Sequence, residues 1–239
     1  DFRVGYNAAQ NALYLALEVQ DESVVMLRSG GNWNNQDGCD FYLDVDHLGL
    51  DSPVRQYALW GNILNFFGSQ GTLGRPKDIQ LVQQRSAQGR QYEGRLDVGE
   101  VSGGRVALHP GLILGLDVSV ADKDEDGSYS WLSWGRGVSK NFFPDRRGDV
   151  LLVEEGRPMG QLKGRIAWKD TRTGIKRGKA QILPAGAEGF PLIANADVAG
   201  QFDVELPAGP YHIQLAGEEA GASSQLIQVK PGGQTTAEL

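Results

Sequence analysis

A tryptophan in a polar loop is the first residue whose setting suggests chemistry. Trp33 lies among Gly and Asn residues in the segment 31–35, where a large apolar side chain gains little unless it packs or binds. Asp40 and Trp60 lie nearby in the sequence, on two segments of alternating polarity. Sugars stack an apolar ring face on an aromatic plane, while carboxylates accept hydrogen bonds from the sugar hydroxyls. These three residues therefore form a candidate sugar site. The alternatives are that Trp33 and Trp60 pack on the core and that Asp40 lies on a solvated strand face.

A second group of carboxylates has the spacing of a calcium loop. Asp122, Asp124 and Asp126 precede Gly127 in a D-x-D-x-D-G pattern, which brings hard oxygen ligands around a tight turn. The pattern stops there, because the twelfth position is Ser133 rather than Glu and no flanking helices are predicted. A solvated acidic hairpin is the favoured interpretation, and calcium at these three aspartates is the alternative.

Enzymatic chemistry has little support in the sequence. It contains no G-x-S-x-G nucleophile motif, no H-E-x-x-H motif and no phosphate-binding glycine loop. The three histidines, His47, His109 and His212, are isolated from one another and from a nucleophile. The sequence therefore predicts a non-catalytic segment.

The composition narrows the class of protein further. The 239 residues include 33 Gly and 10 Pro, yet 40% are hydrophobic, which excludes a fibrous or wholly disordered chain and favours short strands joined by turns. A single cysteine, Cys39, excludes an intramolecular disulfide. No run approaches the ~18 apolar residues of a membrane-spanning helix. The start at Asp1, without a leader, is expected of a matured product or an excised segment.

Charge and aromatic residues divide the chain into two parts. Residues 1–157 hold 15 Lys/Arg and 22 Asp/Glu, whereas residues 158–239 hold 8 of each. Four of the five Trp lie in the first part. An acidic surface of this kind argues against nucleic acid as a partner, because phosphate binding needs basic patches. We therefore expect two domains, 1–157 and 158–239.

Period-two alternation must position these residues, because helical periodicity is almost absent. Residues 12–19, 39–45 and 112–121 alternate most clearly between apolar and other residues. Residues 96–101 are a weak candidate for a short helix or turn. The fold class is therefore all-β, with two sandwiches. The other strands of the first domain are expected near 55–61, 79–85, 90–97, 129–134 and 149–154. Those of the second are expected near 161–168, 178–183, 190–195, 200–206, 210–216 and 224–230, with a tight hairpin at 207–210.

The first domain resembles a family 9 carbohydrate-binding module, a member of the DOMON-like sandwich class. The residues that carry the resemblance are the strand 11–21 ending in Asp, Trp33 followed by 37–44, the strand 113–122, Trp131 to Trp134, and 144–150. The opening strand of that family is expected to be missing here. The second domain resembles a carboxypeptidase regulatory-like, transthyretin-like domain through residues 160–166, 180–183, 196–202 and 206–211.

These resemblances imply a function for each domain. In the first family, a second aromatic faces the first across the sugar, which points to Phe142 and Phe143 in the loop 140–145, near Asn141. The second domain is implied to be a spacer. The whole is implied to be part of a larger exported bacterial protein, periplasmic, cell-surface or extracellular, with a glycan or oligosaccharide as partner.

Two alternatives remain beside sugar binding. Both domains could be structural or protein-interaction modules without a small ligand. The DOMON-like class also contains haem-binding members, for which Met26 with His47 or His109 could supply axial ligands, although Met26 lies in an apolar stretch typical of core packing.

Overall fold

The computed structural model describes most of the chain in two compact units. The described residues are 1–27, 33–48, 53–68, 71–72, 76–86, 88–168, 170–216 and 224–239. The units are Asp1–Val150 and Leu151–Leu239. The boundary at 157/158 that the sequence suggests falls slightly later and stays a prediction.

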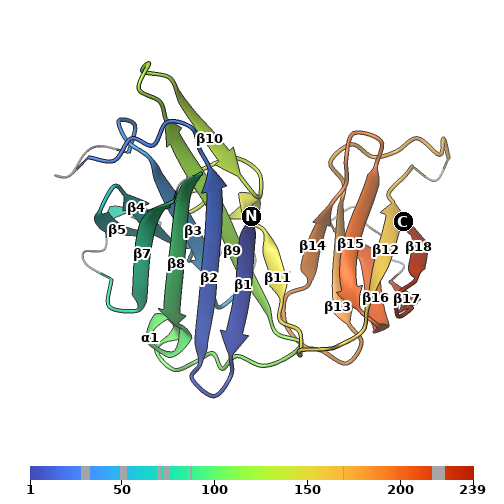
Figure 1. Cartoon of the computed structure of the whole chain (residues 1–239). Helices are drawn as coiled ribbons and strands as arrows, with labels where there is room; N and C mark the ends of the chain where they lie inside the picture. The colour runs from blue at the N-terminus through green and yellow to red at the C-terminus, as the bar shows by residue number, and fades with distance from the viewer. Residues whose placement is uncertain are drawn as a thin grey trace. The chain divides into compact units, whose positions relative to one another are not determined.

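The first unit is built almost entirely of antiparallel strands, which Figure 1 labels in chain order. Its elements are β1 (Phe2–Asn7), β2 (Ala12–Gln20), β3 (Gly38–Asp44), β4 (Arg55–Trp60), β5 (Ile63–Gly68), β6 (Gly71–Thr72), β7 (Ile79–Ser86), β8 (Gly89–Asp97), α1 (Val98–Ser102), β9 (Ile113–Lys123), β10 (Tyr129–Ser133), a 3-10 turn (Pro144–Arg146) and β11 (Asp149–Leu151).

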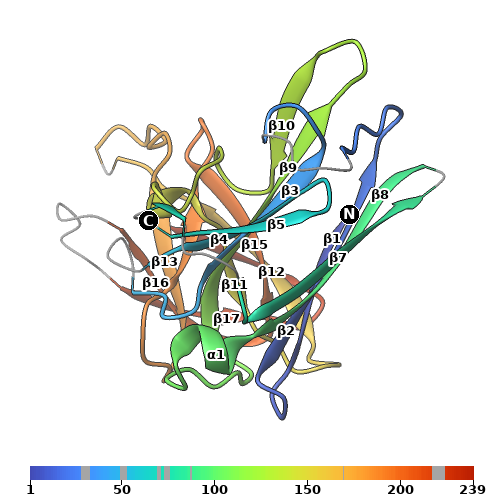
Figure 2. The ribbon, with the colours of Figure 1, turned by 90° about the vertical axis from the view of Figure 1, so that its left-hand side faces the viewer.

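Two sheets make this unit a sandwich. One sheet has the order β1-β2-β8-β7, visible side by side in Figure 1, and the other has the order β10-β9-β3-β4-β5-β6, with β11 also paired to β9. The β9–β10 hairpin projects beyond the neighbouring strands (Figure 2). The inward residues of β2 and β8 meet those of β3 and β9 in the core, and the rings of Phe2 and Phe41 lie 6.1 Å apart across it. The predicted all-β sandwich is confirmed.

The helix α1 is short and capped at both ends. The side chain of Asp97 accepts a hydrogen bond from the N–H of Glu100, and Gly103 ends the helix with a φ of 61°. It lies close to the short helix or turn predicted at 96–101. Within the described part of the chain, no helix is long and apolar enough to cross a membrane.

The second unit is a smaller sandwich with sheets ordered β15-β12-β18 and β14-β13-β16-β17. Its strands are β12 (Met159–Arg165), β13 (Lys179–Pro184), β14 (Leu192–Asn195), β15 (Gln201–Pro207), β16 (Gly209–Leu215), β17 (Gln225–Val229) and β18 (Gln234–Glu238). The expected hairpin at 207–210 is wrong: β15 pairs with β12, whereas β16 pairs with β13 and β17, so this tight turn crosses from one sheet to the other. Four observed strands, β1, β5 and β6 of the first unit and β18 of the second, were not predicted from the sequence.

Candidate functional site

The site lies on the outer face of the larger sheet of the first unit. One row of directly paired residues across its strands, here called a rung, carries two tryptophans. Trp131 on β10 lies opposite Ala121 on β9, which lies opposite Gly38 on β3, which lies opposite Trp60 on β4. Directly opposed residues of antiparallel strands point to the same face. The two indoles therefore stand at the ends of a rung whose middle positions have almost no side chain, and this leaves a hollow between them.

The next rung places Asp40 on the floor of this hollow. Asp40 is only 2% exposed, so the alternative of a solvated strand face is wrong. Trp60 Nε1 donates to one carboxylate oxygen of Asp40 at 3.0 Å, and the hydroxyl of Tyr42 donates to the other at 3.2 Å. The side chain of Gln56 also forms a hydrogen bond with the carboxylate of Asp40. Burial raises the pKa of Asp40 to about 7, and these three hydrogen bonds oppose that rise.

An irregular segment, residues 134–148, is fastened across the same face. Asp117 on β9 accepts hydrogen bonds from the N–H groups of Gly135 (3.1 Å) and Gly148 (2.8 Å), near its two ends. Lys140, in the middle of the segment, brings its Nζ to 2.5 Å from Asp117 Oδ1. Burial lowers the pKa of Lys140, while Asp117 counteracts this shift. This buried ion pair holds the middle of the covering segment, whereas backbone hydrogen bonds to β9 hold its two ends, from the N–H of Trp134 to the carbonyl oxygen of Val118 (3.0 Å) and from the N–H of Leu116 to the carbonyl oxygen of Gly148 (3.0 Å).

The covering segment presents Asn141 and Phe142 to the hollow. Asn141 is 2% exposed, and its Nδ2 donates to the carbonyl oxygen of Gly68 at 3.2 Å. Its Oδ1 is buried and has no hydrogen-bond partner among the described residues. Phe142 is 56% exposed at the rim. Phe143 instead lies under the guanidinium of Arg146, 4.0 Å from the ring centroid, and does not line the hollow.

Trp33 completes an aromatic wall with two residues of β10. Its ring centroid lies 5.8 Å from that of Tyr129 and 6.3 Å from that of Trp131. The hydroxyl of Tyr129 donates to the carbonyl oxygen of Trp33 at 2.8 Å. Trp33 is 47% exposed, so it is not a lid folded onto the core.

Together these residues enclose a cavity of about 460 Å³. Its lining residues come from the Trp33 loop, β3, β4, β5, β10 and the covering segment: Trp33, Asp40, Gln56, Trp60, Phe67, Trp131, Val138, Ser139, Asn141 and Phe142. Four of the five residues predicted from the sequence, Trp33, Asp40, Trp60 and Phe142, line it. Sequence reasoning did not place Trp131, Phe67 or Gln56 there, and only strand register could have shown that these residues share the face of Asp40.

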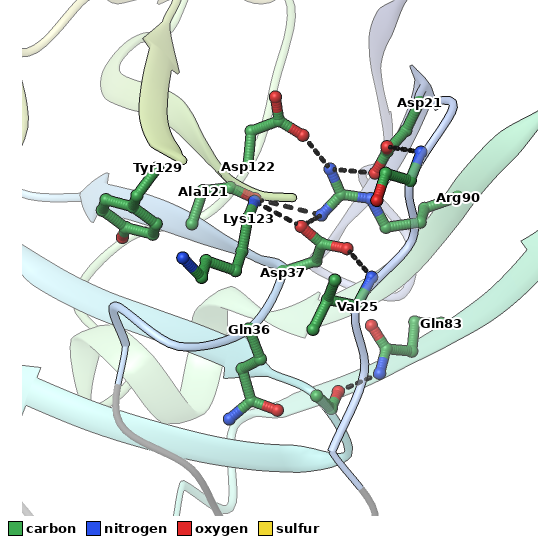
Figure 3. Close-up of polar contacts among 12 residues, drawn as sticks. Asp21, Val25, Gln36, Asp37, Gln83, Arg90, Ala121, Asp122, Lys123 and Tyr129 are labelled. Atoms are coloured by element: carbon green, nitrogen blue, oxygen red, sulfur yellow. Dashed lines mark hydrogen bonds and ion pairs between the residues drawn. The ribbon is translucent and has the colours of Figure 1, made fainter. Parts of the chain in front are cut away.

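A charge cluster, buried except at Asp122, lies beside the aromatic wall (Figure 3). The guanidinium of Arg90 on β8 lies between three carboxylates, 2.9 Å from Asp21, 3.4 Å from Asp37 and 3.3 Å from Asp122. Arg90 also donates to the carbonyl oxygen of Ala121 at 3.0 Å. A single cation therefore faces three acidic side chains at the point where the two sheets meet.

Asp37 connects both segments that carry the aromatic wall. One carboxylate oxygen accepts the N–H of Val25 at 2.6 Å, in the segment that leads towards Trp33. The other accepts the N–H of Lys123 at 2.8 Å, where β9 turns towards β10. Burial raises the pKa of Asp37 to about 6, although these backbone hydrogen bonds and Arg90 lower it.

The acidic hairpin predicted as a possible calcium loop distributes its carboxylates differently. Among the described residues, the acidic group whose oxygens all lie within 4.8 Å of one another is Asp21, Asp37 and Asp122, without Asp124 or Asp126. Asp124 accepts the hydroxyl of Ser128 at 2.6 Å, and Asp126 accepts the N–H of Ser128 at 2.8 Å. Calcium at Asp122, Asp124 and Asp126 stays a prediction.

The potential haem ligands do not meet at the cavity. His47 Nε2 lies 2.9 Å from Asp149 Oδ1 in a buried pair, and Nδ1 of His109 lies 2.8 Å from the carbonyl oxygen of Pro110 at the surface. Neither histidine nor Met26 is among the residues that line the cavity.

Comparison with known proteins gives structural similarities only. No protein-family model matches the chain, and no curated protein matches it. The chain is similar to a family 9 carbohydrate-binding module from Caldicellulosiruptor kristjanssonii in complex with glucose, with a TM-score of 0.48 and 16% identity over 65% of this chain and 77% of that one. A family 9 module from the same organism in complex with cellotriose gives a TM-score of 0.48 and 16% identity over 65% and 75%. The pilus 2b backbone protein of group B streptococcus gives 0.29 and 9% over 100% and 96%. Because these similarities are low, the ligand must be inferred from the cavity.

Proposed function

We propose that the first unit is a non-catalytic carbohydrate-binding module whose ligand occupies the cavity between Trp60 and the aromatic wall. The observation that carries this proposal is the pairing of aromatic planes with two buried polar groups, Asp40 and the unpartnered Oδ1 of Asn141. A buried acceptor without a partner costs about 1–3 kcal/mol, which a ligand hydroxyl would recover.

The arrangement matches the two faces of a sugar ring. The apolar C–H face of a pyranose stacks on an indole, and its hydroxyls lie at the ring edge, where they can donate to a carboxylate and an amide oxygen. Trp33, Trp60 and Trp131 provide the planes, Asp40 provides an acceptor on the floor of the cavity, and Asn141 provides an acceptor from the covering segment. The described residues that line the cavity include no nucleophile activated by a base, so binding rather than catalysis is its expected role.

A matched pair of variants tests this proposal. Phe142→Ala removes a ring that lines the cavity, whereas Phe143→Ala removes the adjacent ring, which lies on Arg146 outside it. Screening a broad glycan array and then measuring affinity by calorimetry should show at least about tenfold weaker binding for Phe142→Ala, or about 1.4 kcal/mol, and little change for Phe143→Ala.

Trp33→Ala supplies the stronger perturbation. Because Trp33 is half exposed and packs only at the edge of the sheet, its loss should abolish binding without changing the melting temperature. If no saccharide binds the wild-type chain, or if Trp33→Ala acts only by destabilising it, the alternative of a structural or protein-interaction module is correct.

The proposal extends to the setting of the chain. The family resemblances support an exported bacterial protein with further domains, in which the second unit is a carboxypeptidase regulatory-like spacer. Expression of residues 1–157 alone tests the division of roles, because it should retain the saccharide affinity of the whole chain.

A further inference from the structure

Asp40 differs from the other deeply buried aspartates of the first unit in its partners. Four of them face a basic side chain: Asp37 faces Arg90, Asp44 faces Arg147, Asp78 faces Arg55 and Asp117 faces Lys140. The three donors that reach Asp40, from Trp60, Tyr42 and Gln56, are all neutral. Asp40 is also the aspartate of this set that lines the cavity.

A buried carboxylate without a cation is costly to ionise. The charged form loses hydration that neutral donors replace only in part. Asp40 therefore holds its proton up to about pH 7, whereas a cation beside it would keep it ionised and gain a charge-assisted hydrogen bond. Lys140, Arg146 and Arg147 of the covering segment are directed elsewhere: the Nζ of Lys140 to Asp117 and to Ser133 at 2.8 Å, Arg146 to the ring of Phe143, and Arg147 to Asp44.

The rest of the lining also favours a cation in the ligand. No Lys, Arg or His is among the described residues that line the cavity, while Trp33, Trp60, Phe67, Trp131 and Phe142 contribute aromatic rings. The faces of aromatic rings carry negative potential and attract ammonium groups. An anionic ligand would meet a carboxylate and ring faces without any compensating positive charge.

We propose that the cavity binds a pyranose carrying a protonated amino group, and that this ammonium donates to Asp40. The inference rests on the proposed function and names the class of sugar. A sugar ring rather than a simple ammonium ion is required because Asn141 Oδ1 needs a second donor and because about 460 Å³ exceeds the space that a small ammonium ion fills.

Calorimetry of the full chain at pH 7 tests the inference with glucosamine and galactosamine, their parent hexoses, N-acetylglucosamine and choline. At least one amino sugar should bind about tenfold or more tightly than its parent hexose, since a charge-assisted hydrogen bond exceeds a neutral one by about that factor. The neutral N-acetyl derivative should lose the gain. Asp40→Asn should reduce the ratio of amino-sugar to hexose affinity below about threefold, and Asp126→Asn, at an exposed carboxylate outside the cavity, should leave it unchanged.

The affinities of the wild-type chain for amino sugars and for their parent hexoses test the inference even if Asp40→Asn fails to fold. Hexoses that bind as tightly as the amino sugars would overturn the inference and leave the proposed function intact. Choline binding without sugar binding would overturn both, and would assign the cavity to organic cations. Failure of every saccharide to bind would refute the proposed function itself.

Discussion

The pH dependence of unfolding gives a quantitative test of the environment of Asp40. Burial raises its pKa to about 7 in the folded chain, against about 3.9 in an unfolded one. Between these values the folded state holds a proton that the unfolded state has released, so the free energy of unfolding falls as pH rises. Each pH unit in this window costs about 1.4 kcal/mol. From pH 5 to pH 8, Asp40 therefore destabilises the folded unit by about 3 kcal/mol, most of it below pH 7.

The variant Asp40→Asn isolates this contribution. Asp37, with a pKa raised to about 6, adds about 1 kcal/mol in the same direction, and this part remains in the variant. The free energy of unfolding is measured by urea unfolding followed by tryptophan fluorescence at pH 5, 6, 7 and 8. Between pH 5 and pH 8 it should decrease by about 3 kcal/mol more in the wild type than in Asp40→Asn. The control Asp126→Asn removes an exposed carboxylate whose pKa is lowered by hydrogen bonds from Ser128, so it should follow the wild type. Parallel profiles for the wild type and Asp40→Asn would refute the argument.

Three further perturbations test the floor of the cavity, the charge cluster and the acidic hairpin. In Gly38→Ala, the new Cβ would lie 2.6 Å from Cδ1 of Trp60, so the indole must move. We expect at least tenfold weaker saccharide binding by calorimetry and a free energy of unfolding lower by about 1–3 kcal/mol. An unchanged affinity would contradict this. Arg90→Met leaves three carboxylates without their shared cation and should lower the free energy of unfolding in urea by about 3–5 kcal/mol. A decrease below about 1 kcal/mol would show that the ion pairs of Arg90 do not stabilise the fold. Because Asp124 is already bonded to Ser128, EDTA should leave the melting temperature unchanged; a decrease that Asp124→Ala removes would instead establish a calcium site.

Alternation along the chain predicts the faces of strands but not what covers them. The pattern of β3 places Phe41 on one face and Asp40 on the other, as observed. Every residue of β3 is buried, however, because the other sheet covers one face and the segment 134–148 crosses the other. The covering segment has no periodicity, and its course depends on the pair formed by Asp117 and Lys140. For this reason the sequence could not separate a buried Asp40 from a solvated one.

The residues that the sequence missed are those whose roles depend on register or on turn geometry. Trp131 is one of several tryptophans in the first unit, and only its pairing opposite Ala121 places it on the rung of Trp60. Phe142 and Phe143 are equivalent in sequence terms. The 3-10 turn that follows brings the guanidinium of Arg146 over the ring of Phe143, and Phe142 alone of the two lines the cavity.

A cavity in a close-packed sandwich requires positions without large side chains and contacts that hold the surrounding segments in place. The small residues Gly38 and Ala121 lie between the two tryptophans, and a Cβ at Gly38 would contact Trp60 and close the floor. The support comes from charges outside the cavity: Asp37 and Arg90 hold the wall, and Asp117 and Lys140 hold the cover. With those cations already paired, the donors that reach Asp40 from the described part of the chain are all neutral. The same charge pairs that keep the cavity open therefore leave one carboxylate inside it for which a ligand must supply the positive charge.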